Sequence, residues 1–237
     1  MNAKGLPWAC IGVSFLTLVM SIILLVTASV FTNHSSYLQH YFGICFSMSI
    51  FTLVITSLGI IFACGLMYVA FRRFPALTTL FSGLLCFVAL LSLIVCIILL
   101  IARPNLRDRS MKNTKSIMSD YNDSDFLRSS KQMMGRVQQT YQCCGADRAL
   151  DWQVRFPDNS STPDSCCFTE TTGCGKDALI GQNKIYLRGC AEPLAAHYRT
   201  RYSTLVGMHF TLIGLCLASA ALGLAWERHI RQEYQLM

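Results

Sequence analysis

The chain has 237 residues, of which 53% are hydrophobic and 14% are charged, and its mean hydropathy is positive. This composition argues against an ordinary soluble domain and predicts a membrane protein. The net charge is +7, but most Lys and Arg lie between Arg103 and Arg201, interleaved with most of the Asp and Glu. No basic run stands clear of acidic residues, so we do not expect nucleic acid as a partner.

The first apolar segment is long enough to cross a bilayer. Residues 8–31 contain no charged side chain, and a spanning helix needs about 20 apolar residues. A cleaved signal peptide with Thr27-Ala28-Ser29 as its cleavage site is the alternative, but its apolar region would be far too long. We therefore expect a short N-terminal tail at 1–7, a first span at 8–31 and a small loop at 32–42.

Three more apolar segments follow. We expect the second span at 43–71, a turn at 72–75, the third span at 76–102 and the fourth span at 203–226. A large polar loop, 103–202, separates the last two spans, and residues 227–237 form a short tail. The four spans place both chain ends on one side of the membrane.

The short flanks of the spans predict the orientation. The side that holds both chain ends carries Lys4, Arg72, Arg73, Arg228 and Arg231, whereas the 32–42 loop has no Lys or Arg. The excess of basic residues in cytoplasmic flanks predicts that both termini are cytoplasmic and that the large loop is extracellular. Three N-x-Ser/Thr triplets, each in a loop assigned to the outside, are the expected glycosylation sites: Asn33, Asn122 and Asn159.

Small residues recur in each span at steps of three and four. Such a stripe lets helix backbones approach closely in lipid and predicts an all-α, left-handed four-helix bundle. The stripes are Cys10, Ser14, Thr17, Ser21 and Ala28; Cys45, Ser49, Thr52, Thr56, Gly59 and Ala63; Thr78, Ser82, Ala89, Ser92 and Cys96; and Gly207, Thr211, Gly214, Ala218, Ala221 and Ala225.

Six cysteines lie in the large loop. Their even number in one polar segment predicts disulfides and an oxidising compartment. Cys143 and Cys144 are neighbours that cannot easily bridge to each other, so each should reach a distant partner. The six allow fifteen pairings, and the residues alone do not choose among them. Zinc ligation is the alternative, but the spacing and the compartment do not suit it; the other four cysteines are Cys166, Cys167, Cys174 and Cys190.

The two ends of the large loop read as helical. Asp123 or Ser124 can cap a helix that ends near Cys143, and Gly145 suits the positive φ that often follows a helix end. A second helix should begin near Ala191, with Pro193 in its first turn, and can continue into the fourth span. The composition of residues 146–189 predicts irregular structure held by disulfides. The apolar face of the first helix comprises Phe126, Met133, Met134, Val137 and Tyr141.

The cysteine framework, together with four spans, a small and a large loop and short tails, resembles the tetraspanin family across the whole chain. The motif residues are Cys143, Cys144, Gly145, Pro163, Ser165, Cys166, Gly189 and Cys190, with Asp151-Trp152 between them. The resemblance implies the pairs Cys143–Cys190, Cys144–Cys166 and Cys167–Cys174. It also implies palmitoylation near the membrane, where Cys10 matches best and Cys64 next. A sterol between the spans is a further expectation from the family, and no residue here singles it out.

The chain resembles a divergent member of the family. Family members commonly carry an Asn in the first span and a Glu or Gln in the third and fourth, and these spans lack them. Members also commonly carry a Cys-Cys-Gly run at the cytoplasmic end of the second span, where this chain reads Ala63-Cys64-Gly65.

The resemblance implies a non-enzymatic scaffold in the plasma membrane or an endosomal membrane. Such a protein associates with its own kind, with other membrane proteins such as receptors, adhesion molecules and proteases, and with membrane lipid. The residues we expect to contact a partner are Phe156, Phe168, Leu179 and Ile180, and filling the core of the loop itself is their alternative role.

Several other functions are alternatives to the scaffold. A four-span channel or transporter needs polar groups inside the membrane, and His209 is the candidate; it can instead reach the membrane interface or a hydroxyl on a neighbouring helix. His197 has no evident nucleophile to serve, so we do not expect catalysis. A claudin-like strand protein would carry cysteines in its first loop, which has none. A curvature-shaping tetraspanin oligomer usually has an extra loop cysteine, and six leave none spare.

Overall fold

The computed structural model describes residues 5–35, 43–119, 121, 127–181 and 184–236. Its contacts divide the chain into two compact units. The bundle unit comprises residues 1–35, 44–101 and 203–237. The loop unit comprises residues 36–43 and 102–202.

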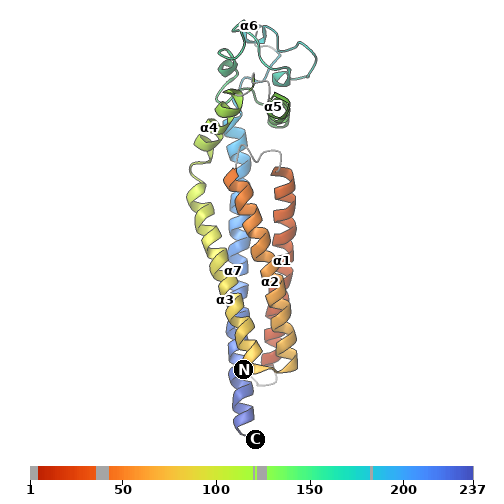
Figure 1. Cartoon of the computed structure of the whole chain (residues 1–237), viewed down its shortest axis with the longest axis vertical. Coiled ribbons are helices and arrows are strands. Elements are labelled where there is room, and N and C mark those ends of the chain that lie inside the picture. The colour runs from red at the N-terminus through yellow and green to blue at the C-terminus, as the bar shows by residue number, and fades with distance from the viewer. Residues whose placement is uncertain (1–4, 36–42, 120, 122–126, 182–183, 237) are drawn as a thin grey trace. The chain divides into compact units, whose positions relative to one another are not determined.

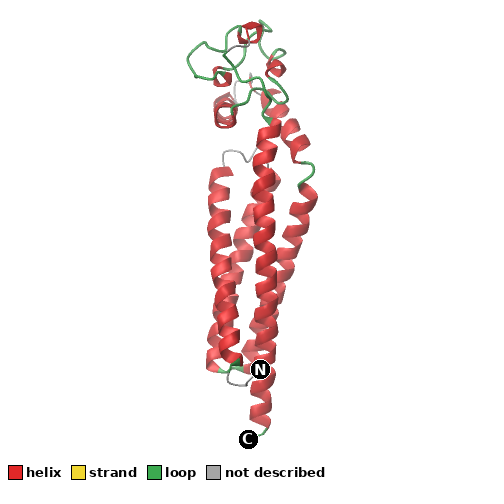
Figure 2. Ribbon diagram, turned by 180° about the vertical axis from the view of Figure 1, so that it is seen from behind, coloured by secondary structure: helices red, strands yellow, loops and turns green. Residues whose placement is uncertain are grey.

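The bundle unit consists of four long helices. These are α1 (Leu6–Ser35), α2 (Gly43–Arg72), α3 (Pro75–Ala102) and α7 (Ala191–Gln235), whose residues from Ser203 onward belong to this unit. All four are long and apolar enough to cross a membrane, and they run side by side (Figures 1 and 2). The predicted fold class, an all-α membrane protein with a four-helix bundle, is confirmed. The limits of the spans within these helices stay predictions.

The turn between α2 and α3 is as short as the sequence suggests. Arg73 adopts φ +58°, and the N–H of Phe74 donates to the carbonyl of Val69 at 3.3 Å. This five-residue step back is the bond that closes a Schellman motif at a helix end. Pro75 then opens α3, where its fixed φ suits the first helical position and its missing N–H costs nothing.

The predicted small-residue stripes of α1, α2 and α3 face the interior of the bundle. Every described member of these three stripes is buried. Cys45 belongs to the second stripe, and its side chain lies outside the described part. Close packing is visible at Gly65 of α2, where a Cβ would lie 2.2 Å from the ring of Phe81 of α3. Small side chains therefore set the helix spacing in this part of the bundle.

The stripe predicted for α7 is wrong. Its six residues, from Gly207 to Ala225, lie on the exposed face. The helix carries a second set at the same steps of three and four, displaced by two residues, and this set is buried: Leu205, His209, Leu212, Cys216, Ser219 and Gly223. Because both faces repeat with the same period, periodicity alone does not choose between them. The buried face is the one with the larger and more polar side chains.

Hydrogen bonds link α7 to the other helices. The Thr17 and Ser219 hydroxyls lie 2.8 Å apart, and the Trp226 indole N–H donates to the Ala70 carbonyl at 3.3 Å. His209 is fully buried, with Nε2 3.3 Å from the Thr52 hydroxyl. The Thr52 hydroxyl itself donates to the Met48 carbonyl at 2.9 Å, so Nε2–H of His209 is the donor to Thr52. Of the two roles that the sequence left open for His209, the structure shows the contact with a hydroxyl on a neighbouring helix.

The loop unit contains short helices joined by turns. They are α4 (Leu106–Ser119), α5 (Leu127–Tyr141), α6 (Ala178–Gly181), the 3₁₀ helices η3 (Ala149–Trp152) and η4 (Asp164–Cys166), and the start of α7. The continuation of the last helix into the fourth span was predicted from sequence. Helix α4 was not predicted, because its buried face includes Ser110 and Thr114, which weaken the apolar periodicity.

Helix α5 ends earlier than expected. Its last residue is Tyr141, and Gln142, not Gly145, takes the positive φ, +50°, that follows the helix. The N–H of Cys143 donates to the carbonyl of Gln138 at 3.1 Å, which closes a Schellman motif. Gly145 does adopt a positive φ, +76°, but in the next turn. The predicted capping residues Asp123 and Ser124, and Phe126, lie outside the described residues.

Candidate functional site in the large loop

Three disulfides frame the loop unit. They join Cys143 to Cys190, Cys144 to Cys166, and Cys167 to Cys174. These are the pairs that the family resemblance implies. The first two bridges start from neighbouring residues at the end of α5 and tie that point both to the start of α7 and to η4. The third closes a short loop within the irregular segment, between Cys167 and Cys174.

Backbone hydrogen bonds join the segment after α5 to the segment before α7. Cys144 N–H donates to the Arg188 carbonyl at 2.8 Å, Gly189 N–H to Asp147 at 3.0 Å, and Cys190 N–H to Gly145 at 3.0 Å. The two segments are so close that a Cβ at Gly189 would lie 2.2 Å from the carbonyl carbon of Asp147. A glycine is therefore required at this motif position for lack of space.

Asp151 stabilises the turn that follows the Cys-Cys-Gly motif. Its Oδ2 accepts hydrogen bonds from the backbone N–H groups of Ala146, Asp147 and Arg148, at 3.0, 2.6 and 3.2 Å. A carboxylate that accepts several N–H donors is among the stronger local interactions in proteins. The next residue, Trp152, is fully buried. The Asp151-Trp152 pair thus joins the turn to the core of the loop.

The Pro-x-Ser-Cys motif docks on α5. The Ser165 hydroxyl donates to Gln138 Oε1 at 2.6 Å, and Gln139 Nε2 donates to the carbonyls of Ser165 and Cys167 at 2.9 and 3.1 Å. A Cβ at Gly135 would be in ordinary contact with Ser165, at 3.5 Å. Neighbouring turns of α5 therefore position the backbone on both sides of Cys166.

Gly175 is a structural residue that the sequence analysis missed. A Cβ there would lie 2.0 Å from the carbonyl oxygen of Thr162. The Asp164 carboxylate accepts hydrogen bonds from the N–H groups of Gly173 and Gly175 at 2.9 and 2.8 Å. The Gly-Cys-Gly spacing, with an Asp inside the preceding motif, was the signal that could have identified this turn.

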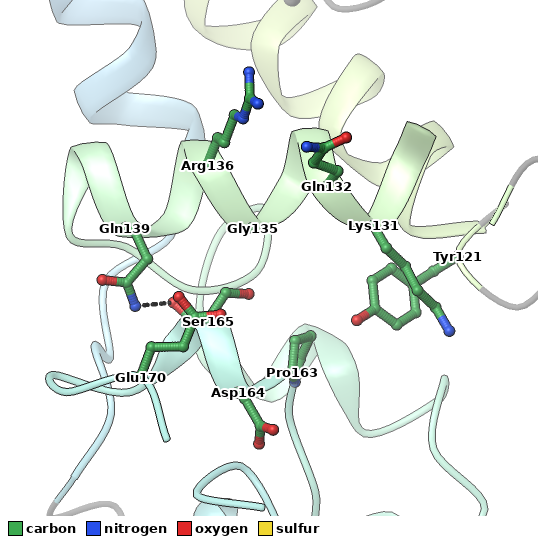
Figure 3. Close-up of a pocket in the computed structure, with 10 residues that line it drawn as sticks. All are labelled: Tyr121, Lys131, Gln132, Gly135, Arg136, Gln139, Pro163, Asp164, Ser165 and Glu170. Carbon is green, nitrogen blue, oxygen red and sulfur yellow. Dashed lines mark hydrogen bonds between the residues drawn. The ribbon is translucent and has the colours of Figure 1, made fainter. Parts of the chain in front are cut away.

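Two hollows flank the segment from Pro163 to Cys174. The first, about 520 Å³, lies between α5 and residues 163–170. Figure 3 shows Gln139 reaching across it to Ser165, and Lys131 beside the ring of Tyr121, where Nζ lies 5.1 Å from the ring centroid. Burial, and to a lesser extent the charge of Asp164, raises the pKa of the Tyr121 phenol. The second hollow, about 690 Å³, lies beside the Cys167–Cys174 ring and reaches Lys184.

The four residues predicted to contact a partner divide into two pairs. Leu179 is buried, and the Phe156 ring packs on those of Trp152 and Tyr121, with centroids 6.1 and 6.4 Å apart. These two residues contribute to the core of the loop, the alternative that the sequence left open. Phe168 and Ile180 are 55% and 78% exposed, so they remain candidates for partner contact.

The predicted modification sites differ in accessibility. Asn33 is exposed near the end of α1, and Asn159 is exposed with φ +52° in a turn, whereas Asn122 lies outside the described residues. Cys10 is fully buried and Cys64 is exposed. Since an acylated sulfur must lie at the surface, exposure favours Cys64 over Cys10, the reverse of the order from the resemblance. All of these sites stay predictions.

Comparison with known proteins identifies the family. A model of the tetraspanin family matches residues 6–224. This chain belongs to the tetraspanin family. Among curated tetraspanins, the CD63 antigen of Homo sapiens is 30% identical over 126 residues, which cover 51% of this chain and 45% of that protein. The CD63 antigen of Bos taurus is 28% identical over 124 residues, covering 52% and 45%.

A longer match extends over another tetraspanin. The CD151 antigen of Mus musculus is 24% identical over 180 residues, which cover 73% of this chain and 66% of that protein. The matched part of this tetraspanin spans about half the length of the CD63 relatives. The family assignment and the four apolar helices make it an integral membrane protein.

Proposed function

We propose that this tetraspanin is a lateral membrane scaffold. It associates through its large loop and its membrane helices with receptors, adhesion molecules or proteases and with other tetraspanins, and it gathers them into membrane microdomains. In this proposal the protein resides in the plasma membrane, or in an endosomal membrane, with both termini in the cytoplasm and the large loop outside.

The exposure of Phe168 and Ile180 carries this proposal. Both are large apolar side chains that stay more than half exposed on a unit framed by three disulfides. Isolated exposed apolar residues are common on proteins, but two large ones on an ordered loop, one of them lining a hollow, suit contact with another protein. The disulfides keep the loop ordered before a partner arrives, which lowers the entropy cost of binding.

Proximity labelling from a tag on the large loop, in cells that express the protein naturally, tests the scaffold. A four-span protein of another family, expressed at the same level, is the control. The proposal predicts a reproducible set of membrane proteins, other tetraspanins among them, enriched over the control. Labelling that only reproduces the random neighbours of the control would contradict it.

The channel alternative has its own test. The spans contain no Asp, Glu, Lys or Arg, and His209 is the titratable side chain that a conduction path would use. The scaffold proposal predicts that liposomes containing the purified protein show no ion flux above empty liposomes. Flux that is abolished by His209→Ala would favour a channel. A curvature-shaping oligomer would instead produce tubules in the same liposomes.

A further inference from the structure

We propose that the hollow beside the Cys167–Cys174 ring binds an extracellular segment of a partner membrane protein that carries a carboxylate next to an apolar side chain. This inference rests on the proposed scaffold function and specifies the chemistry of one contact. The residues that carry it are Phe168, Lys176, Ile180 and Lys184.

The backbone around this hollow is held in place. Phe168 N–H donates to the Lys184 carbonyl at 2.9 Å, and Tyr186 N–H donates to the Cys166 carbonyl at 2.9 Å. These bonds surround an antiparallel bridge between Cys167 and Ile185, and Ile185 is buried. Phe168 and Lys184 therefore lie on two backbone segments that hydrogen bonds join, and the Cys167–Cys174 disulfide begins at the residue before Phe168.

The apolar part of the surface is preorganised. The Phe168 ring meets the Tyr186 ring edge to face, with centroids 5.0 Å apart, a geometry that aromatic pairs favour. Ile180 follows the buried Leu179 in α6, so the core anchors the helix while the isoleucine points outward. Phe168 lines the hollow and Ile180 lies between two of its lining residues in sequence, Ala178 and Gly181. A partner that covers these residues removes apolar surface from water.

The charges of the hollow select the partner. Lys176 and Lys184 line it, and neither ammonium forms an ion pair with any described residue. The lining also holds one acidic residue, Asp177, whose Oδ1 accepts the Ser160 hydroxyl at 2.7 Å, so two basic residues face one acidic residue and the hollow has an excess of positive charge. This excess of positive charge, beside the exposed ring of Phe168, complements a segment that carries a carboxylate and an apolar side chain.

The other hollow fits this role less well. Its lining holds two acidic residues, Asp164 and Glu170, and two basic ones, Lys131 and Arg136, so the formal charges cancel. Among its described lining residues, the partly buried ring of Tyr121 is the one large apolar group. A sulfated glycan would satisfy the two lysines of the second hollow but would gain nothing from Phe168 or Ile180. We therefore commit to a protein segment, and a glycan is an outcome of the test that overturns the inference.

The test is site-specific photocross-linking in intact cells. A photoreactive amino acid replaces Ile180 in the full chain, and the cross-linked peptides are identified by mass spectrometry. The inference predicts cross-links to an extracellular peptide that contains Asp or Glu. A second variant adds Lys176→Glu and Lys184→Glu, and a matched control instead adds Lys112→Glu and Lys115→Glu, two lysines of α4 with the same change in charge.

The expected result is a loss of at least tenfold in cross-link yield for the Lys176/Lys184 pair and no loss for the control. When the acidic residue of the cross-linked partner peptide is replaced by lysine, the variant with Lys176→Glu and Lys184→Glu should regain its cross-link yield. Non-reducing peptide mapping verifies that all three disulfides persist in the Lys→Glu variant. If they do not, the variant with Lys176→Gln and Lys184→Gln is used in its place.

Several outcomes overturn the inference. They are equal yields in the two lysine pairs, a cross-linked peptide without an acid, a cross-linked glycan, and no cross-link at residue 180. If proximity labelling still enriches partner proteins in these cases, the scaffold function stands and only this contact is wrong. If the labelling fails as well, the scaffold function is itself contradicted.

Discussion

Gly189→Ala is predicted to destabilise the loop unit although it adds only one methyl group. The new Cβ would lie 2.2 Å from the Asp147 carbonyl carbon and 2.4 Å from the Ala146 carbonyl oxygen, whereas ordinary contacts begin at 3.4 Å. Both contacts are to backbone atoms, which cannot rotate away as a side chain can. The two segments must therefore separate by about 1 Å.

This separation would break hydrogen bonds. Gly189 N–H donates to Asp147 and Ala191 N–H donates to Ala146, each at 3.0 Å, and a further separation of about 1 Å places both beyond hydrogen-bond range. Two lost bonds at about 1 kcal/mol each, with the cost of leaving buried groups unpaired, predict a loss of about 2–4 kcal/mol. The Cys143–Cys190 bridge holds the segments near each other but does not create space for the methyl group.

Hydrogen–deuterium exchange of the full-length protein in detergent measures this effect. The amides of residues 189–191 should exchange at least tenfold faster in Gly189→Ala than in the wild type. Gly181→Ala is the matched control, because nothing lies within 4 Å of its Cβ position and its φ is not positive; its stability should change by no more than about 0.5 kcal/mol. Equal protection in the two variants would refute the reasoning.

Four further predictions concern single residues. Cys190→Ser removes the bridge that closes the longest loop, worth about 4 kcal/mol on the chain-entropy model, so the protein should be retained in the secretory pathway; normal surface staining would argue against the framework. Cys64→Ser should reduce palmitate incorporation in an acyl-exchange assay more than Cys10→Ser does, since Cys64 is exposed and Cys10 is buried; the opposite order would contradict the structure. His209→Leu should leave the thermal stability in detergent nearly unchanged, because one neutral hydrogen bond contributes about 1 kcal/mol; a large loss would indicate an essential polar contact. Hydrogen bonds, chiefly from the Ser161 hydroxyl, lower the pKa of Asp158 from its ordinary 3.8, so this turn should be stabilised above about pH 3.8 and lose protection as the pH falls further; Asp158→Asn should abolish that acid dependence in amide exchange.

The bundle illustrates what hydropathy and periodicity can predict. The length of the apolar runs was sufficient for four spanning helices, and the stripes of α1, α2 and α3 lie on their buried faces. In α7 two stripes share one period, and the choice between them depends on which neighbours the helix meets. His209 was the useful indication, because a histidine in a membrane helix needs a partner inside the protein. Its burial fixes the face.

Less of the loop unit than of the bundle could be predicted from the sequence. The cysteine pairing came from family resemblance and could not come from the residues, which allow fifteen arrangements. The end of α5 was misplaced because the positive φ that follows the helix was assigned to Gly145, whereas Gln142 adopts it in a Schellman motif. Glycine is merely the residue that reaches this conformation most easily. Gly175 was missed because its requirement is a lack of space beside Thr162; the Gly-Cys-Gly spacing indicates a turn there but does not show which backbone the glycine meets.

The four residues predicted to contact a partner differ in burial for a related reason. Composition identified four large apolar residues in the irregular segment but could not rank their burial. In the structure Leu179 belongs to the core and Phe156 packs against the rings of Trp152 and Tyr121, while Phe168 and Ile180 remain exposed. Neighbouring residues of the same class, such as Leu179 and Ile180, take opposite roles because successive positions on a helix face different directions.

The most direct measurement compares proximity labelling by the wild-type chain and by Phe168→Ser, Ile180→Ser at equal surface levels. Both side chains are exposed, so these substitutions should leave the disulfide framework intact. The scaffold account predicts that the set of membrane proteins labelled from the large loop collapses towards that of the four-span control. An unchanged set of labelled proteins would contradict the claim that this tetraspanin works by contact through its large loop.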